Sequence, residues 1–106
     1  MTLRQIQYLI ALADAGHFGR AAERCCVSQS TLSLQLRRME TYLGLELFDR
    51  ERRGIWDTPA AREIVELGRQ MLRLAGAIRQ VAARAPAGVA PARAPARPID
   101  TINCKG

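Results

Sequence analysis

Residues 27–44 read VSQSTLSLQLRRMETYLG, and their pattern predicts a helix with one buried face and one open face. Apolar residues recur in it at the helical period and form one stripe: Leu32, Leu36, Met39 and Leu43. Ser28 can accept a hydrogen bond from the free backbone N–H groups at the start of the helix. Gly44 can adopt the left-handed conformation that ends a helix.

The opposite face of this predicted helix combines short hydrogen-bonding groups with cations. It carries Gln29, Ser30, Thr31, Ser33, Leu34, Arg37 and Arg38. Gln can pair with adenine, Ser and Thr can bond a base or a phosphate, and exposed N-terminal amides attract phosphate oxygens. Ordinary solvated helices also carry such faces, so the neighbouring segments decide between the two interpretations.

Two more helical stripes precede this segment. The nearer one consists of Phe18, Ala21, Ala22 and Cys25, and the farther one of Leu3, Ile6, Ile10 and Ala13. Thr2 is a suitable cap for the first helix, and Gly16 is a suitable stop. With a turn at Val27-Ser28, the last two of the three helices have the layout of a helix-turn-helix that reads DNA in the major groove.

Downstream, Leu47–Arg50 and Ile55–Asp57 are β-prone runs joined by a turn at residues 51–54. A basic hairpin beside a helix-turn-helix is a wing. Arg52 and Arg53 would then enter the minor groove or contact phosphates, and a solvated charged turn is the alternative.

Residues 59–84 are rich in helix formers, with Thr58 as cap and Pro59 in the first turn. Apolar residues at alternating spacings of three and four predict a coiled-coil seam with a second copy: Ile64, Leu67, Met71, Leu74, Ile78 and Val81. Such a helix reaches on the order of 40 Å. The alternative is a helix folded back on its own domain. Gly68 and Gly76 weaken the helix but leave room for a close neighbour.

These motifs resemble the winged helix-turn-helix of the LysR-type bacterial transcriptional regulators. The matching segments are Leu3 to Ala13, Phe18–Arg24, Val27–Ser33, Gln35–Glu40, Leu43-Gly44, Leu47–Arg50 and Thr58–Ala60. His17-Phe18 and Cys25 are most similar to the subgroup of hydrogen-peroxide-responsive regulators. The resemblance also implies that the linker helix pairs two subunits on a two-fold-related DNA site.

The resemblance places base contacts at Gln29, Ser30, Ser33 and Leu34, with Arg53 on the wing. The family often has Pro where Ser30 stands and Arg where Leu34 stands, so these two base contacts do not carry over unchanged. An apolar side chain such as Leu34 can instead contact a thymine methyl group.

The composition agrees with a small nucleic-acid-binding domain. The chain has 106 residues, with 16 Lys+Arg against 10 Asp+Glu and a net charge of +6. Such a charge favours double-stranded DNA or another polyanion as partner. No apolar run is long enough to cross a membrane and no signal peptide is visible, so we expect a cytoplasmic protein without a membrane partner.

The sequence indicates neither catalysis nor a cofactor. No nucleophile, base and orienting acid are suitably spaced, and no glycine-rich phosphate loop follows a strand. Cys25 lies on the core stripe, Cys26 points outward and Cys104 lies in the tail, so no metal site is expected. A thiol switch at Cys26 is a further hypothesis.

The last segment, residues 85–106, is rich in Ala, Pro and Arg without an apolar period, and it is expected to be a disordered tail. LysR-type regulators carry an effector-binding domain after the linker helix. Nothing in this segment resembles one, so we expect a regulator cut short, with no small-molecule effector site.

The sequence therefore predicts a mainly α fold with a winged helix-turn-helix (residues 1–58), a linker and dimerisation helix (residues 59–84) and a tail (residues 85–106). The predicted function is that of a sequence-specific DNA-binding transcriptional regulator module that forms a homodimer or higher oligomer through the linker helix. The alternative is a truncated interaction module that forms mixed dimers with a full-length regulator.

Overall fold

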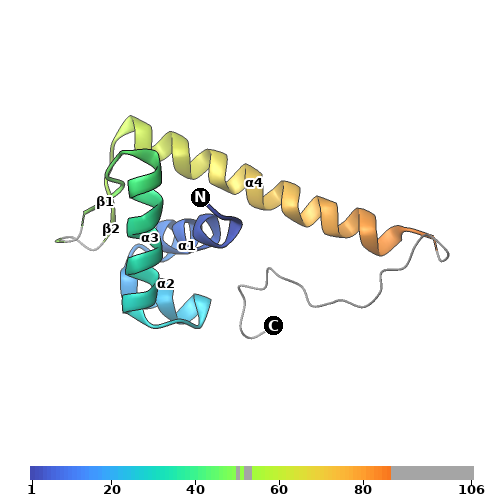
Figure 1. Ribbon diagram of the computed structural model, residues 1–106, viewed down its shortest axis with the longest axis horizontal. Helices are drawn as coiled ribbons and strands as arrows, with labels where there is room; N and C mark the ends of the chain where they lie inside the picture. The colour runs from blue at the N-terminus through green and yellow to red at the C-terminus, as the bar shows by residue number, and fades with distance from the viewer. Residues whose placement is uncertain (50, 52–53, 87–106) are drawn as a thin grey trace.

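The computed structural model describes residues 1–49, 51 and 54–86, and it is mainly helical (Figure 1). The elements follow in the order α1 (Leu3–Ala15), α2 (Phe18–Cys25), α3 (Gln29–Leu43), β1 (Phe48–Asp49), β2 (Gly54–Ile55) and α4 (Pro59–Arg84). This is the predicted fold class, with three helices, a two-stranded hairpin and a long fourth helix.

The helix ends lie where local hydrogen bonds satisfy the free backbone groups. At the start of α1, Thr2 and Gln5 form a capping box, and Gly16 ends the helix at φ 71°. At the start of α2, Nδ1 of His17 accepts hydrogen bonds from the backbone N–H groups of Gly19 (3.1 Å) and Arg20 (3.4 Å). His17 is thus the N-cap of α2.

The core lies between α1, α2 and α3. Its largest fully buried side chains are Ile6, Leu9, Leu12, Leu32, Leu36, Met39 and Leu47. The rings of Phe18 and Phe48 meet edge to face with centroids 6.3 Å apart, so the hairpin is anchored to α2. Nε2 of Gln5 donates to Oε1 of Gln35 at 3.2 Å, which connects α1 to α3.

The predicted wing is present but its strands are shorter than expected. β1 and β2 pair antiparallel, with Phe48 opposite Ile55 and Asp49 opposite Gly54. Gly54, predicted in the turn, belongs to β2, whereas Trp56 lies beyond the strand and its N–H donates to the carbonyl of Leu47 at 2.9 Å. The sequence could not show that Gly54 belongs to the strand, because the residues that pair also depend on the opposite strand.

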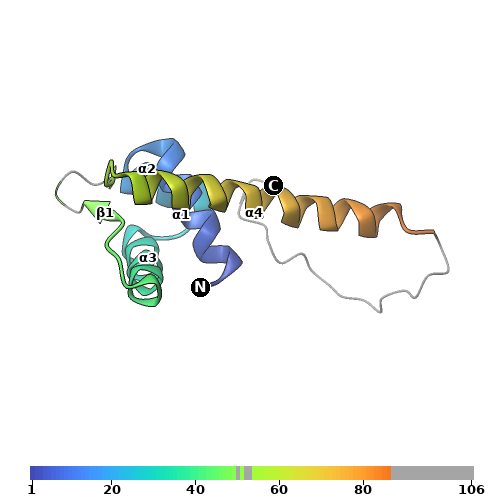
Figure 2. The same ribbon diagram turned by 90° about the horizontal axis from the view of Figure 1, so that it is seen from above.

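The long helix α4 packs on α1 along its first half, and its second half extends past the domain (Figure 2). Gly68 is buried at this contact, where an added Cβ would lie 3.3 Å from Ile6 Cγ2 and from Ile10 Cδ1. Nη2 of Arg69 lies 2.9 Å from Oδ1 of Asp14. The first half of α4 therefore does fold against its own domain, while the second half leaves its apolar side open.

Candidate nucleic-acid interface

The outward face of α3 gathers the residues predicted to contact DNA. Leu32, Leu36 and Met39 fix the rotation of α3, since all three are completely buried. The opposite side is exposed and carries Gln29, Ser30, Thr31, Leu34, Arg37 and Arg38, while Ser33 is half-buried at its edge. The structure thus brings all seven predicted α3 residues to the accessible part of one helix.

The first turn of α3 holds its hydroxyl groups in a network around Ser28. The Oγ of Ser28 accepts from the backbone N–H of Thr31 at 3.0 Å and donates to its Oγ1 at 2.9 Å. The Oγ atoms of Ser28 and Ser30 are 3.1 Å apart. These contacts position donors and acceptors at the positive end of the helix dipole, where an anion such as phosphate is stabilised.

The start of α2 lies beside the start of α3, which the sequence did not indicate. An added Cβ on Gly19 would lie 3.8 Å from Oε1 of Gln29, so the Gln29 side chain reaches the first turn of α2. Arg20 is exposed in that same turn. The residue spacing within either helix could not reveal this neighbour, because the contact depends on the angle between the helices.

Glu40 connects α3 to the hairpin. Its Oε2 accepts hydrogen bonds from the backbone N–H groups of Leu47 at 2.7 Å and Phe48 at 3.0 Å. A carboxylate that accepts two N–H groups forms charge-assisted bonds, which are stronger than neutral ones. The wing is thus held at a defined position relative to α3. Arg52 and Arg53, predicted to contact DNA from the wing, lie outside the described residues.

The predicted seam of α4 is mostly exposed. Leu67, Met71, Leu74, Ile78 and Val81 are between 40% and 69% exposed. Ile64 differs, because it packs partly against the domain core. The seam therefore runs along the open side of α4, and its first position also contributes to the domain.

We also searched the described part of the chain for metal-binding, membrane-spanning and reactive groups. No three His, Cys, Asp or Glu side chains there are placed to hold a metal ion, and no helix there is long and apolar enough to span a membrane. Cys25 is a buried free thiol, and this burial raises its pKa against the opposing effect of Arg4 and Arg24. Such a thiol is a poor nucleophile because little of it is ionised.

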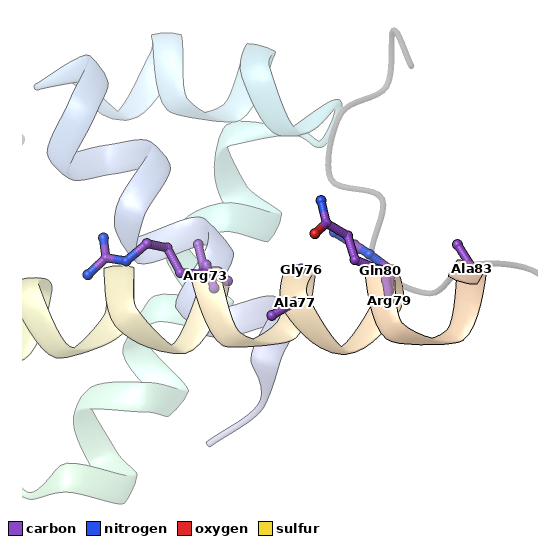
Figure 3. Close-up of a pocket in the computed structure, with 7 residues that line it drawn as sticks. Arg73, Gly76, Ala77, Arg79, Gln80 and Ala83 are labelled. Carbon is purple, nitrogen blue, oxygen red and sulfur yellow. The ribbon is translucent and has the colours of Figure 1, made fainter. Parts of the chain in front are cut away.

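A shallow surface depression lies on the second half of α4 (Figure 3). Its described lining comes from this helix alone: Leu72, Arg73, Gly76, Ala77, Arg79, Gln80 and Ala83. Small-molecule sites are concave and mostly apolar, with a few convergent polar groups. A depression that a single helix lines is open and not enclosed, and we assign no ligand to it.

Comparison with known proteins identifies similar chains. Residues 3–62 match the family model for bacterial regulatory helix-turn-helix proteins, lysR family. The hydrogen peroxide-inducible genes activator of Pectobacterium carotovorum subsp. carotovorum is 42% identical over 84 residues, which cover 79% of this chain and 28% of that relative. This chain therefore spans 28% of the length of that relative.

Two solved structures are similar as well. A full-length OxyR variant from Pseudomonas aeruginosa matches with a TM-score of 0.73 and 42% identity, covering 78% of this chain and 28% of that one. The CbnR DBD–DNA complex matches with a TM-score of 0.68 and 40% identity, covering 79% of this chain and 100% of that one. The peroxide-inducible activator among the relatives agrees with the subgroup that His17, Phe18 and Cys25 resemble.

Proposed function

Because the chain belongs to the lysR family of bacterial regulatory helix-turn-helix proteins, we propose that it binds double-stranded DNA sequence-specifically and regulates transcription in the cytoplasm. The observation that carries this proposal is the exposed face of α3, where hydroxyl, amide and guanidinium groups project from a helix whose other side is locked in the core. The similarity to a domain solved on DNA supports it.

In this proposal, phosphate contacts position the domain and base contacts specify the sequence. Arg37 and Arg38 on α3 and the N-terminal amides of α2 and α3 contact phosphates, together with Arg20. Gln29 and Ser33 reach base edges in the major groove, where Gln can bond adenine with both of its amide groups. Arg52 and Arg53, which lie outside the described residues, are proposed to contact the adjacent backbone or minor groove from the wing.

We further propose that the molecule is divided into a DNA-binding unit (residues 1–58), a dimerisation helix (residues 59–84) and a tail (residues 85–106). The exposed apolar seam of α4 supports the dimer, since five large apolar side chains on one exposed side favour a second copy. Two-fold symmetry then requires half-sites separated by about 34 Å or a multiple of it.

DNA recognition is tested by selecting bound duplexes from a random pool with the purified chain. Gln29→Ala should then relax base preference at one position, while Arg37→Ala should weaken binding to all sequences and lower the salt slope by about 1. Arg84→Ala is the matched control, because this exposed arginine lies at the far end of α4. Failure to select any sequence, together with no binding to duplex DNA at low salt, would refute the proposal.

Dimerisation is tested separately by sedimentation of the Ile78→Asp variant. Ile78 is 69% exposed, so a charge there leaves the domain core intact, but it places a carboxylate inside the proposed seam. The variant should be monomeric, whereas Gln80→Asp, which places a carboxylate on the side of α4 away from the seam, should behave as the wild type. An unchanged oligomeric state of Ile78→Asp would contradict the seam.

The same exposed seam also supports the alternative function, capture of a full-length regulator in a mixed dimer. Co-expression with a full-length relative distinguishes the two functions. The interaction module is favoured if a mixed dimer forms and this chain by itself does not bind DNA. Loss of that mixed dimer in Ile78→Asp would show that it forms through the seam.

A further inference from the structure

Leu34 is an apolar side chain at the centre of the polar face of α3. It is 47% exposed, and it contributes little to the core. Its neighbours one helical turn away are Ser30 and Thr31 on one side and Arg37 and Arg38 on the other. All four are exposed and polar, so among the described residues of α3 Leu34 is an apolar group with polar neighbours on both sides.

This isolation limits what Leu34 can recognise. A protein-docking surface requires a contiguous apolar area, which the residues around Leu34 do not supply. Leucine has no donor or acceptor, so it reads no hydrogen-bonding base edge. If a polar base edge faced it, that edge would lose water without a replacement bond, which costs free energy.

The apolar group that the major groove offers is the C5 methyl of a pyrimidine, which thymine carries and unmodified cytosine lacks. We propose that Leu34 determines specificity by covering a pyrimidine C5 methyl group in each half-site. The inference rests on the proposed DNA-binding function and adds to it the class of base that α3 reads at its centre.

The polar residues around Leu34 support this geometry. Ser30 and Thr31 lie toward the N-terminus of α3, where the hydroxyl network around Ser28 fixes their positions. Arg37 and Arg38 lie toward the C-terminus and suit phosphates. Leu34 lies between these two groups, so a helix placed in the groove with both groups in contact also presses Leu34 against the base edges.

The test replaces each thymine of the selected site, one at a time, with deoxyuridine, which differs only in lacking the methyl group. Binding of wild type and Leu34→Ala is compared by fluorescence anisotropy. At one thymine per half-site the wild type should lose affinity by about fourfold, the equivalent of burying one methyl group. Leu34→Ala should bind the two duplexes nearly equally.

A second pair of duplexes distinguishes the two sources of the methyl group. The critical thymine pair is replaced by a cytosine or a 5-methylcytosine pair. A wild-type preference for 5-methylcytosine extends the contact to methylated cytosine, whereas an effect confined to thymine assigns the contact to thymine. Leu45→Ala, which changes an exposed leucine beyond the end of α3, is the control and should retain the wild-type response to deoxyuridine.

The inference is overturned if wild type and Leu34→Ala respond equally to every deoxyuridine, or if the selected half-site contains no thymine. Both results leave sequence-specific binding intact, so they are distinguishable from failure of the proposed function, in which no site is selected. Because Leu34 is half exposed, Leu34→Ala should unfold at the wild-type temperature, which excludes misfolding as the cause.

Discussion

The two glycines of α4 give a matched pair of substitutions that tests how the helix packs. At Gly76 an added Cβ meets only the Arg79 guanidinium at 3.7 Å, so a leucine there can extend freely. At Gly68 the Cβ would already lie 3.3 Å from carbons of both Ile6 and Ile10. The remaining leucine atoms would require the Ile6 and Ile10 side chains to shift or α1 and α4 to separate.

The two substitutions should change the free energy of unfolding in different directions. Leucine is a far better helix former than glycine, so Gly76→Leu should stabilise the fold by about 0.5–1 kcal/mol. The same gain at Gly68 is offset by an overpacking cost of about 1–3 kcal/mol. Gly68→Leu should therefore be less stable than Gly76→Leu by about 1–3 kcal/mol.

Urea unfolding followed by circular dichroism measures this difference. Both variants must be compared at the same protomer concentration, because association contributes to apparent stability. The comparison also cancels the effect of losing glycine from the unfolded chain, which is the same at both positions. Equal stability of the two variants would refute the close contact between α1 and α4.

Three further predictions follow, two on hydrogen bonds and one on the titration of a thiol. Ser28→Ala removes the N-cap of α3 and should cost about 1 kcal/mol in urea unfolding; an unchanged midpoint would contradict the cap. Glu40→Ala leaves the N–H groups of Leu47 and Phe48 without this acceptor and should cost about 1–3 kcal/mol, with Glu46→Ala, an exposed neighbour, as control. Because burial raises the pKa of Cys25, the unfolded chain releases the thiol proton first. The free energy of unfolding should then fall as the pH rises through about 8.5, the ordinary thiol value. Cys25→Ala should lack this step, and a slope that persists in this variant would assign it to another group.

The sequence predicted the features that depend on neighbours along the chain. The stripe through Leu32, Leu36 and Met39 set the rotation of α3, and so predicted which side stays open. Thr2, Ser28 and the glycines at 16 and 44 marked helix ends because caps bond within one turn. These signals need no knowledge of the rest of the fold.

Features that depend on distant contacts could not be predicted in the same way. Gly68 and Gly76 are equivalent in sequence, yet only Gly68 meets another helix in the described structure. His17 caps α2 through a side-chain orientation that no periodicity encodes. The position of Gln29 beside Gly19 depends on how α2 and α3 cross. Ile64 packs partly against the domain core, although it belongs to the predicted seam, because α4 has two apolar sides.

The glycine contact on α4 has a consequence for how such a molecule can change over time. The exposed groups that face outward from α3 contribute little to the described core, so in the proposed regulator single exchanges there could change base preference and leave folding unaffected. In the proposed dimer, the angle between the two DNA-binding units depends instead on how closely α1 and α4 approach, and a large side chain at Gly68 would disturb that approach. In that dimer, base preference would be free to vary, while the spacing between half-sites would be constrained by the integrity of the fold.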